Sequence, residues 1–139
     1  MTQADCLFCG IVAGAIPSTK VDEDELTYAF MDISPATPGH ALVVPKRHST
    51  NIYDVPPEDL AAVVAAAQRL ALRVRDGLGA DGVNLNNACG PAAGQTVFHF
   101  HFHVIPRYSD PARDSLKLPW IPKPGDPDSI AATAAALRG

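Results

Sequence analysis

The chain lacks the features that define several broad classes of protein. Its three cysteines, Cys6, Cys9 and Cys89, are too few and odd in number for the disulfide framework of a small secreted domain. Lys and Arg number 11 against 15 Asp and Glu, and this balance disfavours a DNA- or RNA-binding surface, which needs clustered basic residues. No apolar run approaches the ~20 residues that span a membrane. We therefore expect no nucleic-acid partner and no membrane contact.

The first residues also lack the basic region and long apolar stretch of a signal peptide, so we expect a cytoplasmic protein. What is present is an ordinary globular composition, with 47% hydrophobic and 19% charged residues in a chain of 139. A chain of this length buries about two thirds of its unfolded surface, which is enough for a core without disulfides. No internal repeat is present, and the length predicts one domain.

Hydrophobic periodicity predicts one long helix and several short strands. The helix covers Pro57–Leu78, with proline suited to its first turn and Gly77 or Gly79 to its end. Its apolar stripe comprises Leu60, Val63, Val64, Ala67, Leu70, Ala71 and Val74. Strands are predicted at Leu26–Met31, His40–Pro45, Gly82–Asn86 and Val97–Ile105, short helical turns within Cys6–Ala15, and a weak helix at Ser129–Arg138. The fold class is α+β, a mostly antiparallel sheet of about five strands with one long helix against a face.

Three histidines alternate along the last predicted strand. Because strand side chains point to opposite faces in turn, His99, His101 and His103 share one face, spaced about 6–7 Å apart. The other face, formed by Phe98, Phe100, Phe102 and Val104, is expected to be core. Neutral imidazoles ligate zinc, and an oriented imidazole acts as a base or nucleophile near pH 7. This row is the main candidate for chemistry.

A second candidate is the pair Cys6 and Cys9, whose C-x-x-C spacing lets two thiolates hold one tetrahedral ion. A thioredoxin-like redox pair is the alternative, although that motif normally follows a strand and opens a helix. Two thiolates together with two histidines would complete a structural Cys₂His₂ zinc site.

Several segments together resemble the histidine triad (HIT) family of nucleotide hydrolases and transferases. They are Phe30-Met31-Asp32-Ile33-Ser34-Pro35, Pro38-Gly39-His40, Val44-Pro45-Lys46-Arg47-His48, Ala93-Gly94-Gln95-Thr96-Val97-Phe98-His99 and the H-x-H-x-H run that ends before Pro106-Arg107. The resemblance covers about Cys6 to Arg107, roughly three quarters of the chain, and points to the zinc-bearing bacterial branch. The residues beyond Tyr108 carry no matching motif.

The resemblance implies a division of labour among these residues. His101 matches the nucleophile that attacks the α-phosphorus and becomes nucleotidylated, His103 the member that contacts phosphate, and His40 a further active-site histidine. Cys6, Cys9, His48 and His99 match the zinc ligands, and Asp32 the carboxylate that binds the ribose hydroxyls. The remaining nucleotide-binding residues that it implies, around the base and phosphate, are Phe8, Ile11, Phe30, Ile33, Leu42, Asn87, Gln95, Thr96 and Val97.

The family pattern departs from this sequence at one point. It often carries Asn seven residues before the Gln of its A-G-Q segment, where this chain has Ala88, so Asn87 is taken as the stand-in and the register against Asn86 stays open. By the same resemblance we expect a homodimer, with the long helix and its neighbouring strand near the interface. The family domain is expected over residues 1–108, with residues 109–139 as an extension that packs on the same domain or on the dimer partner. Within it, the proline- and charge-rich stretch Ser109–Asp126 is expected to wrap the surface.

Two other functions stay open from the residues. One is a metalloenzyme in which His99, His101 and His103 all bind a catalytic metal. The other is a nucleotide- and zinc-binding regulatory module without turnover. The substrate is also open, since adenosine phosphoramidate, a dinucleoside tetraphosphate and nucleotidylated amines all suit a purine-nucleotide site of this kind. Asp32 has a simpler reading as a turn-capping residue before Ser34-Pro35, and Cys89 is assigned no role.

Overall fold

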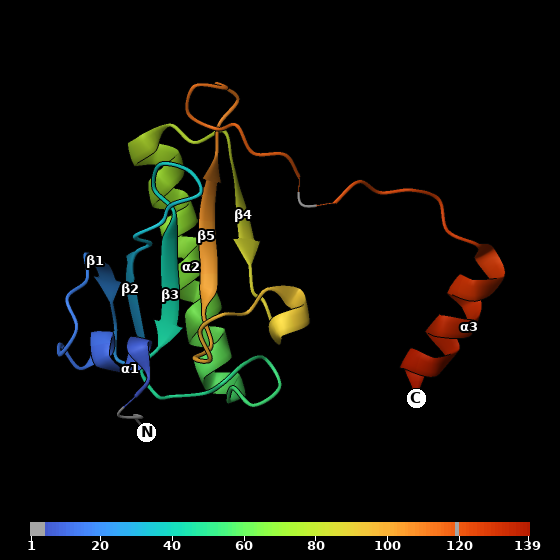
Figure 1. The fold of residues 1–139 in the computed structure, drawn as a ribbon, viewed down its shortest axis with the longest axis horizontal. Helices are drawn as coiled ribbons and strands as arrows, with labels where there is room; N and C mark the ends of the chain where they lie inside the picture. The colour runs from blue at the N-terminus through green and yellow to red at the C-terminus, as the bar shows by residue number, and fades with distance from the viewer. Residues whose placement is uncertain (1–4, 119) are drawn as a thin grey trace.

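The computed structural model describes residues 5–118 and 120–139 and contains a five-stranded antiparallel sheet in the order β1-β2-β3-β5-β4 (Figure 1). This confirms the predicted α+β class. The strands are β1 Lys20–Glu23, β2 Thr27–Met31, β3 Ala41–Pro45, β4 Gly82–Asn86 and β5 Phe102–Arg107; the helices are α1 Leu7–Val12, α2 Pro57–Leu78 and α3 Pro127–Arg138, with a 3₁₀ turn at Pro91–Ala93. Residues 1–4 of the predicted domain and Pro119 of the predicted extension lie outside the described residues.

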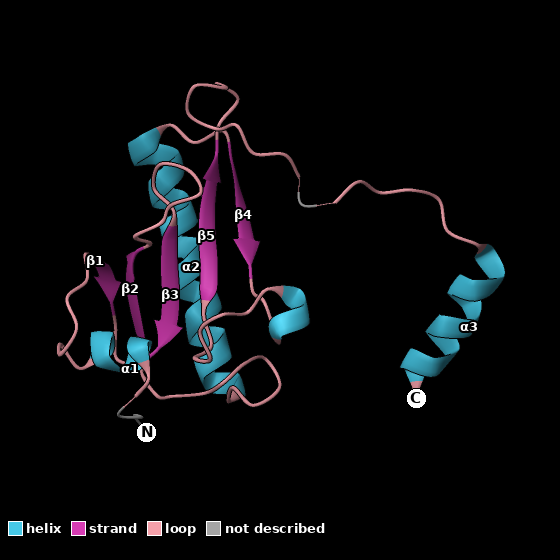
Figure 2. Ribbon diagram, viewed as in Figure 1, coloured by secondary structure: helices cyan, strands magenta, loops and turns pink. Residues whose placement is uncertain are grey.

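Helix α2 lies along one face of the sheet (Figure 2). It begins with proline in its first turn and ends at Gly79, whose φ of 68° is the left-handed conformation that glycine adopts without strain. The helix buries Val63, Ala67 and Leu70 against the sheet. Val64, which the sequence placed in the apolar stripe, is 43% exposed, because it lies at the edge of the stripe and faces away from the sheet.

The opposite face of the sheet is covered by α1. Alternate residues of β3 divide between the two sides, with Val43 in the cluster under α2 and Leu42 and Val44 in the cluster with Phe8 and Phe30. This alternation is the two-residue period of a strand that is buried on both faces. The small second core therefore packs α1, which carries the cysteines, against β2 and β3.

Two strand predictions need correction. Strand β1 was not predicted, because its residues Lys20–Glu23 are mostly polar and form only an edge strand beside β2. The last strand begins at Phe102 and not at Val97, because its partner β3 ends at Pro45, which has no N–H to donate to a longer ladder. The preceding residues bend at Val97–His99 and are held by loop contacts, such as the 2.7 Å bond from the Phe100 N–H to the Ser49 carbonyl. Phe98, expected in the core, is 47% exposed.

The C-terminal extension has two parts. Up to Leu116 it stays on the domain, because Arg107 binds the Asp114 carboxylate and the Leu116 carbonyl. Beyond that point the expectation that Ser109–Asp126 wraps the surface fails, since residues 120–126 are all exposed and the chain runs away from the sheet on the side of β4 (Figure 1). Helix α3, described in full, has no buried residue. None of the described helices is long and apolar enough to span a membrane.

Candidate functional site

The two cysteines and two of the histidines converge at one end of α1. Sγ of Cys9 lies 3.4 Å from Nδ1 of His48 and 3.5 Å from Nδ1 of His99, and Sγ of Cys6 lies 3.4 Å from the same His99 nitrogen. All four ligand atoms lie within 4.8 Å of one another. Because Cys6 is the N-cap of α1 and Cys9 follows three residues later, one helical turn presents both thiols to the same point.

This cluster fits a zinc ion. With Zn–S near 2.3 Å and Zn–N near 2.0–2.1 Å, tetrahedral angles place neighbouring sulfur and nitrogen ligands about 3.6 Å apart, close to the separations above. The ring of His99 is also in the required tautomer, because its Nε2–H donates to the Pro45 carbonyl at 2.8 Å and leaves the Nδ1 lone pair toward the thiols. Burial lowers the pKa of His99 to about 4, so the ring is neutral at pH 7.

His48 is positioned by an ion pair that the sequence interpretation did not include. Its neighbour Arg47 donates from Nε and Nη2 to both oxygens of Asp59, at 2.9 and 3.0 Å. Asp59 is buried in the first turn of α2, so the pair ties the segment after β3 to the helix. The sequence did contain one indication of this ion pair, an acidic residue in the first turn of the predicted helix, eleven positions after the histidine.

His101 lies next in the row and has a different environment. Its Nδ1–H donates to the backbone carbonyl of His99 at 2.7 Å, which leaves Nε2 with its lone pair. The edge of the Phe8 ring packs against it, with ring centroids 5.2 Å apart at 90°. Burial lowers the pKa of His101, so the ring is neutral and Nε2 is unprotonated at pH 7. Such a nitrogen is a competent nucleophile.

His103 and His40 form a hydrogen-bonded pair, with His40 Nε2 and His103 Nδ1 2.9 Å apart. The backbone N–H of Ala36 donates to Nδ1 of His40 at 3.0 Å, so His40 carries its proton on Nε2 and donates it to His103. His103 therefore carries its own proton on Nε2 and offers a donor there. Burial, with the nearby His101 and His40, lowers the pKa of His103 to about 4. Burial also lowers that of His40, although the Asp32 charge opposes this.

Asp32 caps a turn and also faces the histidine pair. One oxygen accepts the backbone N–H of Ser34 at 2.7 Å, as a turn-capping aspartate does. The other lies 3.5 Å from Nε2 of His40. With His40 and His103 it meets the geometry of a second metal group. A metal on His40 Nε2 would require the proton on Nδ1 and would lose the bond from Ala36, so the tautomer argues against an ion there.

A cleft of about 290 Å³ opens beside His101 and His103. Most of the residues that the sequence indicated for nucleotide binding line this cleft. Other lining residues were not indicated by the sequence. The lining comprises Phe8, Ile11, Phe30, Asp32, Ile33, Leu42, Thr96 and Val97 from the earlier set, with Leu7, Ile16, Pro17, Ser18 and Met31 in addition. Ile33 stands at the rim and is 97% exposed. Leu7 begins α1, Ile16, Pro17 and Ser18 follow it, and Met31 ends β2; in the sequence Ile16-Pro17 indicated only a helix end.

Two residues named for nucleotide binding lie outside this lining. Nδ2 of Asn87 donates to the carbonyl of His101 at 2.9 Å, so Asn87 fixes the backbone of the candidate nucleophile. Gln95 is buried and binds three backbone groups, those of Gly90, Thr50 and Val97. It therefore holds the loop that carries Thr96 against the cleft. Both side chains act on the site through the backbone.

The histidine row does not act as one ligand set. Among the described residues that can hold a metal, His99 groups with the cysteines, His103 groups with Asp32, and His101 belongs to neither cluster. The geometry places one histidine in the cysteine cluster, one ring with a lone pair on Nε2 and one ring that donates from Nε2.

Comparison with known protein families decides the identity of the domain. Residues 13–110 match the HIT domain model. The chain belongs to the HIT domain family. It is 48% identical over 104 residues to Protein hit of Bacillus subtilis, covering 75% of this chain and 72% of that protein. It is also 37% identical over 128 residues to a Saccharomyces cerevisiae adenosine 5'-monophosphoramidase, covering 92% and 77% of the two chains.

Solved HIT structures share the fold over nearly the whole chain. The Streptococcus mutans protein SMU.412c aligns with a TM-score of 0.90 and 40% identity, over 99% of this chain and 85% of the other. A zinc-bound histidine triad family protein from Mycobacterium smegmatis aligns with a TM-score of 0.74 and 43% identity, over 96% and 94%. These likenesses agree with the HIT fold.

Proposed function

We propose that this HIT protein hydrolyses nucleotide conjugates through a covalent nucleotidyl intermediate on His101. The observation that carries the proposal is the hydrogen bond from Nδ1–H of His101 to the His99 carbonyl, which leaves a neutral, unprotonated Nε2 in a ring that lines the cleft. A fixed imidazole with a free lone pair is an activated nucleophile at neutral pH.

The reaction proceeds in two displacements. Nε2 of His101 attacks the α-phosphorus, the Nε2–P bond forms and the bond to the leaving group breaks, and an amine leaving group takes a proton from solvent. Water then attacks the same phosphorus, which releases the nucleoside monophosphate, one proton and the free ring. In the intermediate the ring carries a positive charge, and its Nδ1–H bond to the His99 carbonyl becomes charge-assisted.

The neighbouring residues supply donors and positioning. The proton on Nε2 of His103 and the hydroxyl of Thr96, both at the cleft, are available to the phosphate oxygens, where charge accumulates in the transition state. His40 keeps His103 in this tautomer through their 2.9 Å bond. The apolar wall around Phe8, Phe30 and Leu42 receives a purine base, and Asp32 accepts the ribose hydroxyls.

We favour a nucleoside phosphoramidate as the substrate class. The Saccharomyces cerevisiae relative is named an adenosine 5'-monophosphoramidase, and this chain covers 77% of it. Nothing in the cleft demands a second nucleoside, so a dinucleoside polyphosphate is the second candidate and not the first. Transfer of the nucleotidyl group to an acceptor other than water uses the same intermediate.

Zinc has a structural place in this proposal. Cys6, Cys9, His48 and His99 hold the ion, which stabilises the junction of α1 with the segment before β5. Bound there, the ion contributes folding free energy and fixes the His99 ring. The steps at phosphorus use His101 as nucleophile and His103 and Thr96 as donors.

The chain also forms a homodimer in this proposal, with the arm of residues 117–139 resting on the second copy. Residues 1–116 carry eight basic and thirteen acidic residues, a net charge of −5, whereas the arm carries three basic and two acidic, a net charge of +1. The arm exposes Trp120, Ile121, Ile130 and Leu137 to solvent and leaves the domain beside the edge strand β4. The alignment with SMU.412c covers 99% of the chain and so includes the arm. A cytoplasmic location stays a prediction.

The test is a panel of substrates with product analysis on the zinc-loaded protein. Adenosine 5'-phosphoramidate, a nucleotidylated lysine analogue and diadenosine tetraphosphate are each incubated with wild type and with His101→Asn. We expect AMP and free amine from the first two, dependent on His101. Binding of AMP without turnover of any member would instead favour a nucleotide-binding regulatory module.

A further inference from the structure

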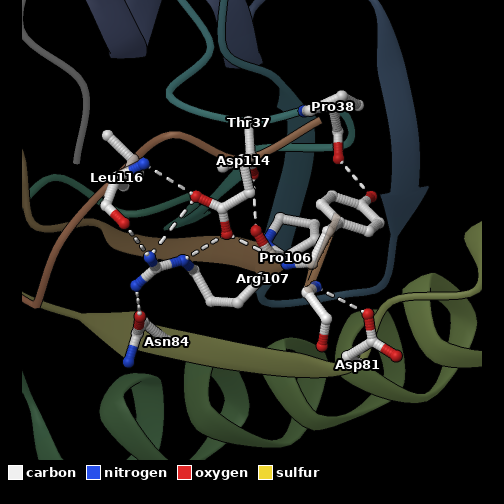
Figure 3. A network of polar contacts seen from close by, with 10 residues as sticks. Thr37, Pro38, Asp81, Asn84, Pro106, Arg107, Asp114 and Leu116 are labelled. Carbon is white, nitrogen blue, oxygen red and sulfur yellow. Dashed lines mark hydrogen bonds and ion pairs between the residues drawn. The ribbon is translucent and has the colours of Figure 1, made fainter. Parts of the chain in front are cut away.

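The loop between β2 and β3 is fastened to β5 by two buried hydroxyl groups. Thr37, which is 3% exposed, donates its hydroxyl to the Pro106 carbonyl at 2.6 Å. The hydroxyl of Tyr108 donates to the Pro38 carbonyl, also at 2.6 Å. Figure 3 shows both contacts at the end of the strand that also carries His103. Two hydrogen bonds of this length hold the loop at a fixed position relative to the end of β5.

The C-terminal end of β5 is itself held by hydrogen bonds, so it fixes the position of the loop that is bound to it. Arg107 binds the carboxylate of Asp114 from Nε at 2.8 Å and the side chain of Asn84 in β4 at 2.8 Å. The backbone N–H of Tyr108 donates to the same carboxylate at 2.9 Å. These contacts, seen together in Figure 3, fix Pro106 and Tyr108 relative to the sheet.

The fastened loop acts on His40. The His40 N–H donates to the Thr37 carbonyl at 3.1 Å, and the Ala36 N–H donates to the ring Nδ1 of His40 at 3.0 Å. Ala36 directly precedes Thr37 in the chain, so the hydrogen bond of the Thr37 hydroxyl holds the position of the Ala36 N–H that reaches the ring. That amide can only donate, and it therefore forces the proton of His40 onto Nε2.

The consequence passes to His103. A proton on His40 Nε2 is donated to Nδ1 of His103, which leaves the proton of His103 on Nε2. With the Ala36 amide displaced, His40 can hold its proton on either nitrogen. In the other tautomer His40 accepts from His103 Nδ1–H, and His103 then offers a lone pair where phosphate needs a donor.

We propose that Thr37 is a positioning residue that sets the tautomers of His40 and His103, with Tyr108 as the second fastening of the same loop. The proposal rests on the proposed function only for its kinetic consequence, because the tautomers exist in the ligand-free protein. No contact of Thr37 with the cleft is involved, since Thr37 is absent from its lining.

The test compares Thr37→Val, which removes the hydroxyl at nearly constant volume, with Thr37→Ser, which keeps it. Thr27→Val is the matched control, because Thr27 is equally buried but lies at the opposite end of β2 from the histidine pair. Tyr108→Phe serves as a second variant should Thr37→Val not fold. Ring ¹⁵N spectra of the full-length protein report which nitrogen carries each proton, and kcat for adenosine 5'-phosphoramidate is measured beside the Kd for AMP.

We expect Thr37→Val and Tyr108→Phe to shift the ¹⁵N resonances of His40 and His103 toward mixed tautomers. Their kcat falls about tenfold, as the loss of a net hydrogen bond implies, while the Kd for AMP changes less than about twofold. Thr37→Ser restores both readouts, and Thr27→Val moves neither.

The proposal is overturned if the ring resonances of Thr37→Val are those of wild type. It is also overturned if kcat and AMP binding fall in parallel, because that is the signature of general disruption of the cleft. If the wild-type protein turns over no substrate of the panel, the proposed function is wrong. In that case the ¹⁵N spectra still decide the role of Thr37.

Discussion

Nδ1 of His101 lies 2.7 Å from the backbone carbonyl oxygen of His99, and the ring of the same His99 faces the two thiols of the metal cluster. One residue therefore connects the two halves of the site. Its side chain belongs to the candidate zinc centre and its backbone orients the candidate nucleophile. Loss of the ion is expected to loosen the orientation of His101 even though the ion takes no part in the chemistry.

The first prediction concerns His101. His101→Asn keeps size and some hydrogen bonding but removes the nucleophile, so turnover falls by several orders of magnitude while AMP affinity stays within about threefold, because a nucleophile acts mainly in the transition state. Wild type quenched in mid-turnover carries one acid-labile nucleotidyl group, mapped to His101 by mass spectrometry. Near-normal turnover in the variant would contradict the assignment and move attention to His103.

The second prediction concerns the metal. The purified protein contains about one zinc per chain, and Cys9→Ser lowers zinc content and Tm together, because a structural site contributes folding free energy directly. Cys89→Ser is the control, since Cys89 lies outside the cluster. Elemental analysis and thermal unfolding are the measurements. Protein purified without chelator that holds no zinc would rule the site out.

The third prediction concerns Asp32. Asp32→Ala weakens AMP binding by about 1.5–3 kcal/mol, the value of a charge-assisted hydrogen bond, and deoxy-AMP shows a smaller loss with wild type. Asp110→Ala is the matched control, because Asp110 caps a turn in the same way, accepting the Ala112 N–H at 2.9 Å, away from the cleft. Calorimetric titration gives both affinities. Equal AMP affinity for Asp32→Ala and wild type would leave Asp32 with its turn-capping role alone.

The fourth prediction concerns pH. Burial and the neighbouring rings lower the pKa of His103 from 6.5 to about 4, so between these values the unfolded chain binds a proton that the folded chain does not. The free energy of unfolding therefore falls as pH drops from 6.5, by up to about 1.4 kcal/mol per pH unit for this group. Denaturant unfolding at pH 6.5 and 5.5 measures the slope, and His103→Gln reduces it. An identical slope in the variant would mean that the ring is not held neutral.

The fifth prediction concerns the C-terminal arm. Trp120 is the sole tryptophan and is 71% exposed in one copy, so docking of the arm on a second copy buries it. Its emission shifts to the blue as protein concentration rises through the dimer range, in parallel with the mass from light scattering. Leu137→Asp weakens both changes and Ala135→Asp, on the other side of α3, does not. A blue shift that is independent of concentration would show the arm folding back on its own domain.

Local pattern was sufficient for the bounds of α2 and β4. The bounds of α2 at Pro57–Leu78 and of β4 at Gly82–Asn86 match the sequence prediction, because proline, glycine and apolar periodicity act over neighbouring residues. The strand with the histidines was predicted five residues too early, since its start depends on where β3 can still donate hydrogen bonds. The residue that ends this hydrogen-bond ladder lies in a partner strand, more than fifty residues away in the sequence.

C-x-x-C spacing and alternating histidines were enough to indicate which residues come together, because they restrict what a backbone can bring to one point. The protonation of each ring followed from contacts that exist only in the folded chain. The proton of His99 is set by the Pro45 carbonyl, that of His101 by a neighbouring carbonyl, and that of His40 by the Ala36 amide. A tautomer depends on the hydrogen-bond partner that the fold places beside each nitrogen, and residue spacing carries no information about that partner.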